Sequence, residues 1–200
     1  MITDSRLSMG RSTIEVVRQA IAGGARLIQL REKNGTDREL VVIGQAVREI
    51  TKAAGAFLLV NDRVDIAQVI GADGVHLGQD DIPVALARKI LGPKKIIGVS
   101  VETGAEARAA EEAGADYVAT GPIFPTTTKP DAGEPYGTGL IGRIKSATSL
   151  PVVAIGGINA GNLAYVVRAG ADGAAMIGAV VGQPDIAGAV RELRQKFHHV

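Results

Sequence analysis

Polar side chains that could bind an anion follow one of the short apolar runs of this sequence. Gln29, Arg31 and Lys33 alternate at the end of the run LIQL, so in an extended chain their side chains lie on one face. Two cations and an amide on one face suit an anion with several oxygen atoms. A solvated strand end with ordinary charges is the alternative interpretation of this stretch.

Two carboxylates follow the next apolar runs along the chain. Asp62 comes after FLLVN and Asp81 after GVHLG, and adjacent strands would bring them close. Mg²⁺ typically takes one or two carboxylates together with phosphate oxygens and water, so the pair predicts a magnesium site beside the cations. Alternatively, Asp62 caps a helix that starts at Val64, and Asp80 or Asp81 caps one that starts at Ile82. Capping accounts for each aspartate singly, but not for the neighbouring Asn-Asp-Arg and Gln-Asp-Asp motifs.

Glycines end two later apolar runs. Gly156 and Gly157 follow PVVAI, and the pair Ile177 and Gly178 follows the next run. Glycine lets backbone N–H groups approach an anion closely, and a helix that starts there adds its dipole. Barrel enzymes often bind phosphate between their last two strands in this way. A tight turn between strand and helix is the alternative.

A hydroxyl-rich loop lies between these groups along the chain. The stretch GPIFPTTTKP, residues 121–130, holds three prolines, which exclude the interior of a strand or a helix. The hydroxyls of Thr126, Thr127 and Thr128 could bind phosphate oxygens, and Lys129 could hold a second anion. We therefore interpret this loop as a lid that bridges two phosphorylated ligands, with a rigid surface turn as the alternative.

The elements that must position these residues alternate along the chain. Apolar strands between amphipathic helices predict an α/β fold with a parallel sheet covered by helices. The strands are expected at Met1–Thr3 (partial), Leu27–Arg31, Phe57–Asn61, Gly74–Gly78, Ile96–Val101, Tyr117–Gly121, Val152–Ile155 and Gly173–Ile177. The helices are expected at Ser12–Ala22, Asp37–Ala54, Val64–Ile70, Pro83–Leu91, Ala105–Ala113, Leu140–Ser146, Ala160–Ala169 and Asp185–Phe197. Eight of each make a single (β/α)8 TIM barrel over residues 1–200, in a short form, with an open doubly wound sheet as the alternative.

A weak repeat supports the barrel. Ala-Gly-Ala-Asp, or a close variant, joins a helix end to the next strand at residues 22, 70, 113 and 169, and its glycine suits the left-handed end of a helix. In a barrel the active groups lie at the carboxyl ends of the strands, so the polar residues named above are expected to converge on one mouth.

Composition narrows the possible functions. Apolar residues make up 46% of the 200 residues, aromatic residues only 3%, and the net charge is +1. Without a basic stripe or a long apolar run, nucleic acid and membrane are not expected as partners. The absence of cysteine excludes thiol catalysis and cysteine-bound zinc, and fits a reducing, cytoplasmic location. No signal peptide is expected, and a homo-oligomer stays open.

Taken together, seven motifs resemble those of the thiamine-phosphate synthase family. They are QLREK (29–33), NDR (61–63), GVHLGQDD (74–81), IGVSV (97–101), GADYVATGPIFPTTTK (114–129), PVVAIGGIN (151–159) and GADGAAMIGA (170–179). The resemblance implies a (β/α)8 enzyme that uses Mg²⁺. It joins 4-amino-2-methyl-5-pyrimidinylmethyl diphosphate to 4-methyl-5-(2-phosphoethyl)thiazole, giving thiamine phosphate and diphosphate. Diphosphate leaves first, and the thiazole nitrogen captures the pyrimidinylmethyl cation.

The resemblance also assigns roles to residues. It implies that the pyrimidine diphosphate is held by Gln29, Leu30, Arg31, Glu32, Lys33, Asn61, Ser100 and Lys129. Among these, it implies a part in catalysis for Arg31, Lys33, Ser100 and Lys129. It places Mg²⁺ on Asp62 and Asp81. It implies that the thiazole phosphate is bound by Thr126, Thr127, Thr128, Gly157, Ile177 and Gly178. Family members often carry serine where this chain has Gly178, and have a longer first strand than Met1–Thr3.

Rival functions fit the residues less well. A thiazole tautomerase resembles this family but uses a histidine after the sixth strand, where this chain has Gly121 and Pro122. A sugar-phosphate epimerase needs paired acid and base groups or a metal-binding histidine set, and a Schiff-base aldolase needs a lysine in an apolar pocket. His76 is expected to be a hydrogen-bonded group of the barrel core. A non-catalytic sensor of thiamine intermediates remains an alternative from another class.

Overall fold

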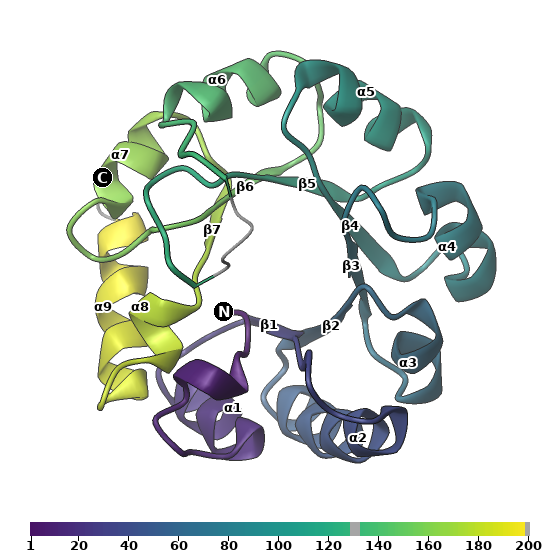
Figure 1. Cartoon of the computed structure of the whole chain (residues 1–200), viewed down its shortest axis with the longest axis vertical. Helices are drawn as coiled ribbons and strands as arrows, with labels where there is room; N and C mark the ends of the chain where they lie inside the picture. Colours follow the sequence, from purple (N-terminus) through teal and green to yellow (C-terminus); the bar gives the residue numbers. More distant parts are fainter. Residues whose placement is uncertain (129–132, 199–200) are drawn as a thin grey trace.

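The protein is built around a curled parallel sheet. The computed structural model describes residues 1–128 and 133–198 of the chain. The strands follow one another in sequence order, and each is hydrogen-bonded to the next. They are β1 (Leu27–Leu30), β2 (Phe57–Asn61), β3 (Gly74–Leu77), β4 (Ile96–Ser100), β5 (Tyr117–Thr120), β6 (Val152–Ile155) and β7 (Gly173–Ala175). Figure 1 shows them around a common centre, as in TIM-like folds.

Helices cover the outside of this sheet (Figure 1). They are η1 (Ser5–Leu7), α1 (Thr13–Ala22), α2 (Asp37–Ala53), α3 (Val64–Val69), α4 (Val84–Leu91), α5 (Gly104–Glu112), α6 (Gly139–Lys145), α7 (Leu163–Arg168), α8 (Gly178–Val181) and α9 (Ile186–His198). None of the described helices is both long enough and apolar enough to span a bilayer.

Side chains point alternately to the two faces of each strand, and this alternation determines which residues line the central cavity. In β1, Ile28 and Leu30 are 0% and 1% exposed and belong to the hydrophobic core between sheet and helices. The residue between them, Gln29, faces the opposite side and lines a central cavity. Because successive strand residues point to opposite faces, one periodicity supplies both the core and the polar interior.

Within the described residues the sheet has seven strands, where eight were expected. Instead of a strand, Met1–Thr3 forms a single bridge, in which Ile2 pairs with Gln29. The N–H of Ile2 donates to the Met176 carbonyl (3.1 Å), and the N–H of Thr3 donates to the Gln29 carbonyl (3.0 Å). The chain start therefore contacts both edges of the sheet, between β7 and β1 (Figure 1).

Two helix starts differ from the capping interpretation of the aspartates. Arg63 occupies the N-cap position of α3 and Pro83 that of α4, and neither start has a side-chain cap. Helix α4 begins at Val84, two residues later than the capping interpretation required. Capping therefore does not explain Asp62, Asp80 or Asp81. The last expected strand also ends early, at Ala175, and α8 and η1 were not predicted.

The Gly-Ala-Asp repeat is a structural device at the amino ends of the strands. Three aspartates, one before each of β3, β5 and β7, accept a backbone N–H from the preceding strand and pair with a cation from a helix. They are Asp73 (Leu58 N–H, 2.8 Å; Arg48, 2.7 Å), Asp116 (Ile97 N–H, 2.7 Å; Arg88, 2.7 Å) and Asp172 (Val152 N–H, 2.7 Å; Lys145, 2.8 Å). The expected positive φ is present at Gly24, Gly71, Gly114 and Gly170.

Candidate active site

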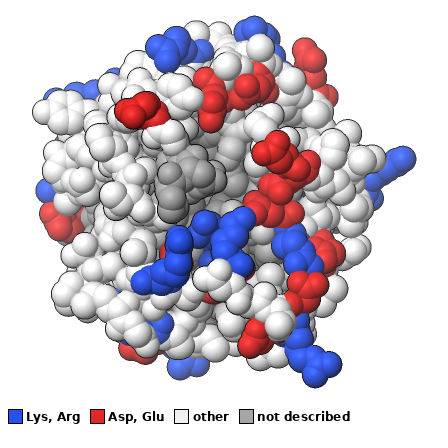
Figure 2. Space-filling model, in the orientation of Figure 1, with Lys and Arg blue, Asp and Glu red and all other residues white. Residues whose placement is uncertain are grey.

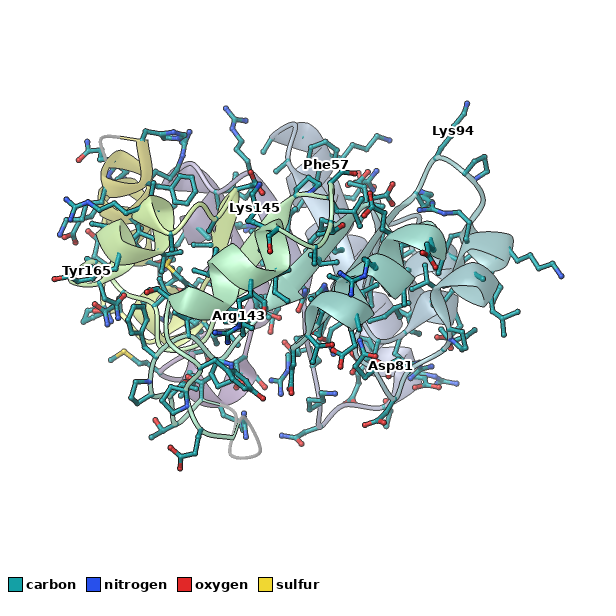
Figure 3. The ribbon with its side chains drawn as sticks, turned by 90° about the horizontal axis from the view of Figure 1, so that it is seen from above. Phe57, Asp81, Lys94, Arg143, Lys145 and Tyr165 are labelled. Carbon is teal, nitrogen blue, oxygen red and sulfur yellow. The ribbon has the colours of Figure 1, made fainter. Side chains whose placement is uncertain are left out.

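A cavity of about 720 Å³ lies at the carboxyl ends of the strands and takes lining residues from all of them. In the side view of Figure 3, Phe57 at the start of β2 and Asp81 beyond the end of β3 lie near opposite ends of the molecule. On the cavity face, Figure 2 shows Lys and Arg side chains gathered beside Asp and Glu side chains. The expected convergence on one mouth is therefore confirmed for most of the described polar residues.

Most of the predicted site residues line this cavity. They are Gln29, Arg31, Lys33, Asn61, Asp62, Asp81, Ser100, Thr126, Thr128, Gly157, Ile177 and Gly178. Three others do not: Leu30 is a core residue, Glu32 accepts a hydrogen bond from the Thr13 hydroxyl (2.5 Å), and Thr127 is exposed. Lys129 lies outside the described residues, so its role stays a prediction.

Cations and carboxylates are paired on one side of the cavity. The Lys33 ammonium lies 2.7 Å from Asp62 Oδ2, and Arg31 Nη1 lies 2.9 Å from Asp4 Oδ2. Asp62 is one of two described non-glycine residues with positive φ (63°). Positive φ is uncommon outside glycine, and here it occurs directly after β2 at the residue whose carboxylate pairs with Lys33.

Asp62 and Asp81 are close enough to interact. Burial raises the pKa of Asp81, and the hydrogen bond and charge of Asp62 raise it further. The N–H of Gly78 donates to Asp81 Oδ2 (2.6 Å), which fixes this carboxylate at the cavity wall. Two neighbouring carboxylates beside a cationic anion site are a donor set that fits Mg²⁺. No cluster of three or more His, Cys, Asp or Glu side chains suited to a metal occurs in residues 1–128 and 133–198, so water and phosphate would complete the coordination.

Ser100 contacts the buried ring of His76, which in turn contacts the half-buried Tyr117. His76 Nε2 lies 2.9 Å from the Ser100 hydroxyl, and His76 Nδ1 lies 2.8 Å from the Tyr117 hydroxyl. A Cβ at Gly98 would lie 2.0 Å from the Tyr117 ring, so only glycine leaves room for it. Burial lowers the pKa of His76 to about 4, so this imidazole is neutral at pH 7. The expectation of a hydrogen-bonded core histidine is confirmed.

The opposite side of the cavity is built from backbone and hydroxyl groups. Gly157 has a φ of +64°, and a Cβ there would lie 2.4 Å from the Pro125 carbonyl oxygen. The N–H of Phe124 donates to the Gly156 carbonyl (3.0 Å), so the loop after β5 packs directly on the turn after β6. Thr128 Oγ1 would contact a Cβ at Gly178 at 3.5 Å, which places the threonine loop beside the start of α8.

Comparison with known proteins decides the family. The model of the family described as thiamine monophosphate synthase matches residues 1–180. The chain belongs to the thiamine monophosphate synthase family.

Relatives of this family match along nearly the whole chain. The thiamine-phosphate synthase of Moorella thermoacetica is 53% identical over 195 residues, which cover 98% of this chain and 93% of the relative. The thiamine-phosphate synthase of Chloroflexus aurantiacus is 50% identical over 194 residues, covering 97% and 89%. The solved structure of thiamine phosphate pyrophosphorylase from Pyrococcus furiosus has a TM-score of 0.90 at 44% identity, covering 98% of this chain and 93% of that one.

The family motifs do not include every polar group at this mouth. Asp4 and Arg6 lie outside these motifs, and they form ion pairs with each other and with Arg31. Tyr117 lies within a motif, but no role was predicted for it, and its hydroxyl lies 2.8 Å from His76 Nδ1. The rule that located the other site residues, polar groups directly after a strand, also applies to Thr3 and Asp4. Their signal was weak because Met1–Thr3 is too short to stand out as a strand.

Proposed function

We propose that this member of the family joins 4-amino-2-methyl-5-pyrimidinylmethyl diphosphate to 4-methyl-5-(2-phosphoethyl)thiazole, forming thiamine phosphate and diphosphate. Family membership supports this reaction. The observation that carries it is one cavity with two unlike sides. Cations and two carboxylates lie on one side, and glycines and hydroxyls lie on the other.

The charged side suits the diphosphate that leaves. Gln29, Arg31, Lys33 and Asn61 would donate to its oxygens, together with Lys129. Asp62 and Asp81 would hold Mg²⁺, which when bound neutralises charge on the departing diphosphate. The ion pair between Lys33 and Asp62 supports this division of roles. When the substrate binds, the diphosphate would pair with Lys33 and Mg²⁺ would bind Asp62.

Bond breaking and bond making need no proton transfer from the protein. The C–O bond to diphosphate breaks, and its electron pair leaves with the diphosphate. The lone pair of the thiazole nitrogen then forms the new C–N bond to the pyrimidinylmethyl cation. Burial lowers the pKa of His76 to about 4, which makes it a weak base and agrees with chemistry that requires no general base. Ser100 would contact the pyrimidine and its amino group, and the cavity would align the two reactants.

The opposite side suits the thiazole phosphate. Backbone N–H groups at Gly157 and Gly178 would approach its oxygens, and the hydroxyls of Thr126 and Thr128 would donate to them. The absence of a Cβ at these glycines permits that approach. Ile177, which lines the same side of the cavity, would complete this subsite.

We also propose that residues 1–200 form a single (β/α)8 barrel domain in which Met1–Thr3 takes the place of the eighth strand. The hydrogen bonds of this segment to Met176 and Gln29 support the assignment. Two phosphorylated metabolites as substrates fit a cytoplasmic enzyme, and a homo-oligomer agrees with this function.

The decisive experiment is mass-spectrometric detection of thiamine phosphate from the purified chain and both substrates. Product is expected with Mg²⁺, and none is expected with a chelator or when either substrate is omitted. Diphosphate release is measured in the same reaction. A chain that binds both substrates but releases no diphosphate would be a sensor, which contradicts the proposal. A chain that instead isomerises the thiazole would be a tautomerase.

A further inference from the structure

The start of the chain, which contacts both edges of the sheet, buries polar side chains that are not needed for its bridge to β1. Thr3 and Asp4 are only 1% and 3% exposed, although Ile2 alone makes the bridge to β1. A buried carboxylate is strongly unfavourable unless it is paired and hydrogen-bonded. The partners of these two residues therefore explain why they are buried.

Thr3 holds the main chain of Arg31. The Thr3 hydroxyl accepts a hydrogen bond from the Arg31 N–H (2.8 Å) and donates one to the Arg31 carbonyl (3.2 Å). Arg31 is the first residue after β1, where the ladder to β2 has ended. A single side chain thus fixes the residue at both of its backbone polar groups.

Asp4 holds the Arg31 side chain. Asp4 Oδ2 accepts from Arg31 Nη1 (2.9 Å) and from Arg6 Nη2 (2.9 Å), and Oδ1 accepts from the Arg6 N–H (3.1 Å) and Nε (3.2 Å). Burial opposes ionisation of Asp4, but the hydrogen bonds from Arg6 and the charges of both arginines lower its pKa overall. Because a guanidinium has five N–H donors, Arg31 keeps others for a ligand in the cavity.

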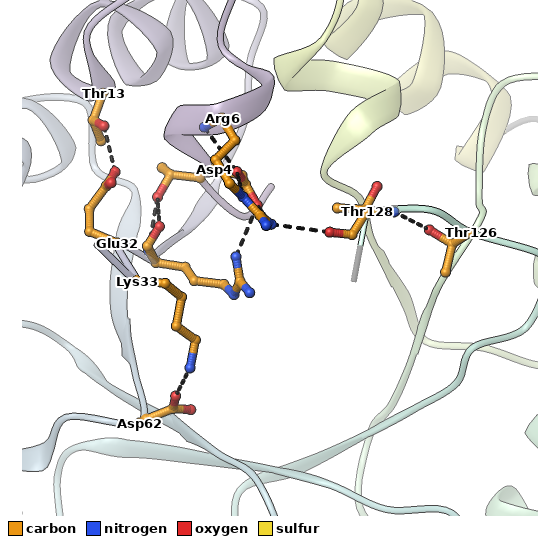
Figure 4. A network of polar contacts seen from close by, with 10 residues as sticks. Asp4, Arg6, Thr13, Glu32, Lys33, Asp62, Thr126 and Thr128 are labelled. Carbon is orange, nitrogen blue, oxygen red and sulfur yellow. Dashed lines mark hydrogen bonds and ion pairs between the residues drawn. The ribbon is translucent and has the colours of Figure 1, made fainter. Parts of the chain in front are cut away.

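Arg6 joins this cluster to the threonine loop. Its Nη2 also donates to the Thr128 carbonyl (3.2 Å), across the mouth of the cavity. Figure 4 shows Arg6 between Asp4 on one side and Thr128 on the other. One side chain therefore contacts both the cation-rich side of the cavity and the hydroxyl-rich side.

We propose that Thr3, Asp4 and Arg6 are positioning residues of the active site. Thr3 and Asp4 hold Arg31 in the orientation that binds the diphosphate, and Arg6 couples this arrangement to the loop that contacts the second substrate. The inference rests on the proposed function, and it adds three residues that act through Arg31 and Thr128 rather than by contact with the reacting atoms.

A simple charge effect predicts the opposite result for one variant. If Asp4 only offset the charge of the arginines, Asp4→Asn would make the mouth more positive and would tighten the binding of an anion. If Asp4 positions Arg31, the same change weakens binding, because the asparagine amide repels one of the two guanidinium groups. The sign of the change in affinity therefore separates the two roles.

The first test is calorimetric titration of the full chain with inorganic diphosphate and Mg²⁺. We expect about tenfold weaker binding for Asp4→Asn and for Thr3→Val, recovery in Thr3→Ser, and no change for the exposed control Arg18→Ala. Thermal unfolding of each variant identifies any that fails to fold. If Asp4→Asn does not fold, Thr3→Val still tests the positioning of Arg31. Unchanged or tighter binding in folded variants would overturn the positioning role.

The second test measures coupling between the two substrates. The affinity for diphosphate is determined with and without saturating thiazole phosphate, and we expect about a fivefold gain in the wild type that is largely lost in Arg6→Ala. Equal coupling in both proteins, or none in the wild type, would refute the part assigned to Arg6. These titrations need no turnover, so failure to form thiamine phosphate would reject the proposed function separately.

Discussion

Replacing Gly157 with alanine tests how the turn after β6 and the threonine loop depend on each other. The φ of +64° costs a residue with a Cβ about 1 kcal/mol. The new Cβ would also lie 2.4 Å from the Pro125 oxygen and 2.7 Å from the Phe124 oxygen, so the loop must withdraw until both distances exceed 3.0 Å. Overpacking of this kind costs about 1–3 kcal/mol, which gives a total of roughly 2–4 kcal/mol.

Gly71 offers a matched control. Its φ is +65°, and a Cβ there would meet no atom within 4 Å. Gly71→Ala is therefore expected to lower the free energy of unfolding by only about 1 kcal/mol, from the backbone conformation alone. The difference between the two variants isolates the close approach between Gly157 and the loop.

Urea unfolding measures the stabilities, and initial rates measure the effect on function. Because a displacement of about 1 Å can cost a hundredfold in rate, we expect Gly157→Ala to raise the KM for the thiazole phosphate at least about tenfold. The KM for the pyrimidine diphosphate should change less, and Gly71→Ala should change neither. Equal stabilities of the two variants, together with an unchanged thiazole KM, would refute this reasoning.

Three further changes have defined outcomes. The pKa of Asp81 is raised in the folded state, so between its ordinary pKa and the raised one this carboxyl is protonated more in the folded chain than in the unfolded chain. The free energy of unfolding therefore falls as the pH rises through this window. Asp81→Asn should remove this slope in Mg²⁺-free urea titrations while lowering Mg²⁺-dependent turnover about a hundredfold; full turnover at low Mg²⁺ would contradict the metal assignment. Because the pKa of His76 is about 4 in the folded protein, the free energy of unfolding should fall by about 3 kcal/mol as the pH falls from 6.5 to 4. His76→Gln should flatten this part of the plot of unfolding free energy against pH. Asp116→Ala should cost about 1–2 kcal/mol in urea unfolding and leave both KM values unchanged, because its partners lie at the far end of the strands; a changed KM would argue against a purely structural role.

Local patterns predicted most of the fold. Apolar periodicity, which depends only on neighbouring residues, predicted the strand Val152–Ile155 with the bounds that it has in the structure. It also predicted where each of the helices α1 to α7 lies. The same rule failed at both ends of the sheet. Met1–Thr3 makes one bridge rather than a strand, and the strand from Gly173 is cut short where α8 begins.

The site could be predicted where its residues directly follow strands. Gln29, Arg31 and Lys33 alternate along one segment, so their shared face is a local property, and all three line the cavity. Whether Asp62 and Asp81 cap helices could not be predicted locally. The answer depends on where α3 and α4 begin, and on Arg63 and Pro83 standing at their N-cap positions.

By itself, the sequence determined the alternation of strands and helices, the polar residues at the strand ends, and the motifs that carry the family resemblance. These depend on the two-residue period of a strand and on the order of elements, both of which are written locally. Only the tertiary structure decided which charges meet. Arg6 and Thr128 are 122 residues apart in the chain, and Asp4 and Arg31 are 27 apart. Such pairs form only when the curled sheet brings the start of the chain to the mouth of the cavity. Spacing along the sequence therefore does not predict them.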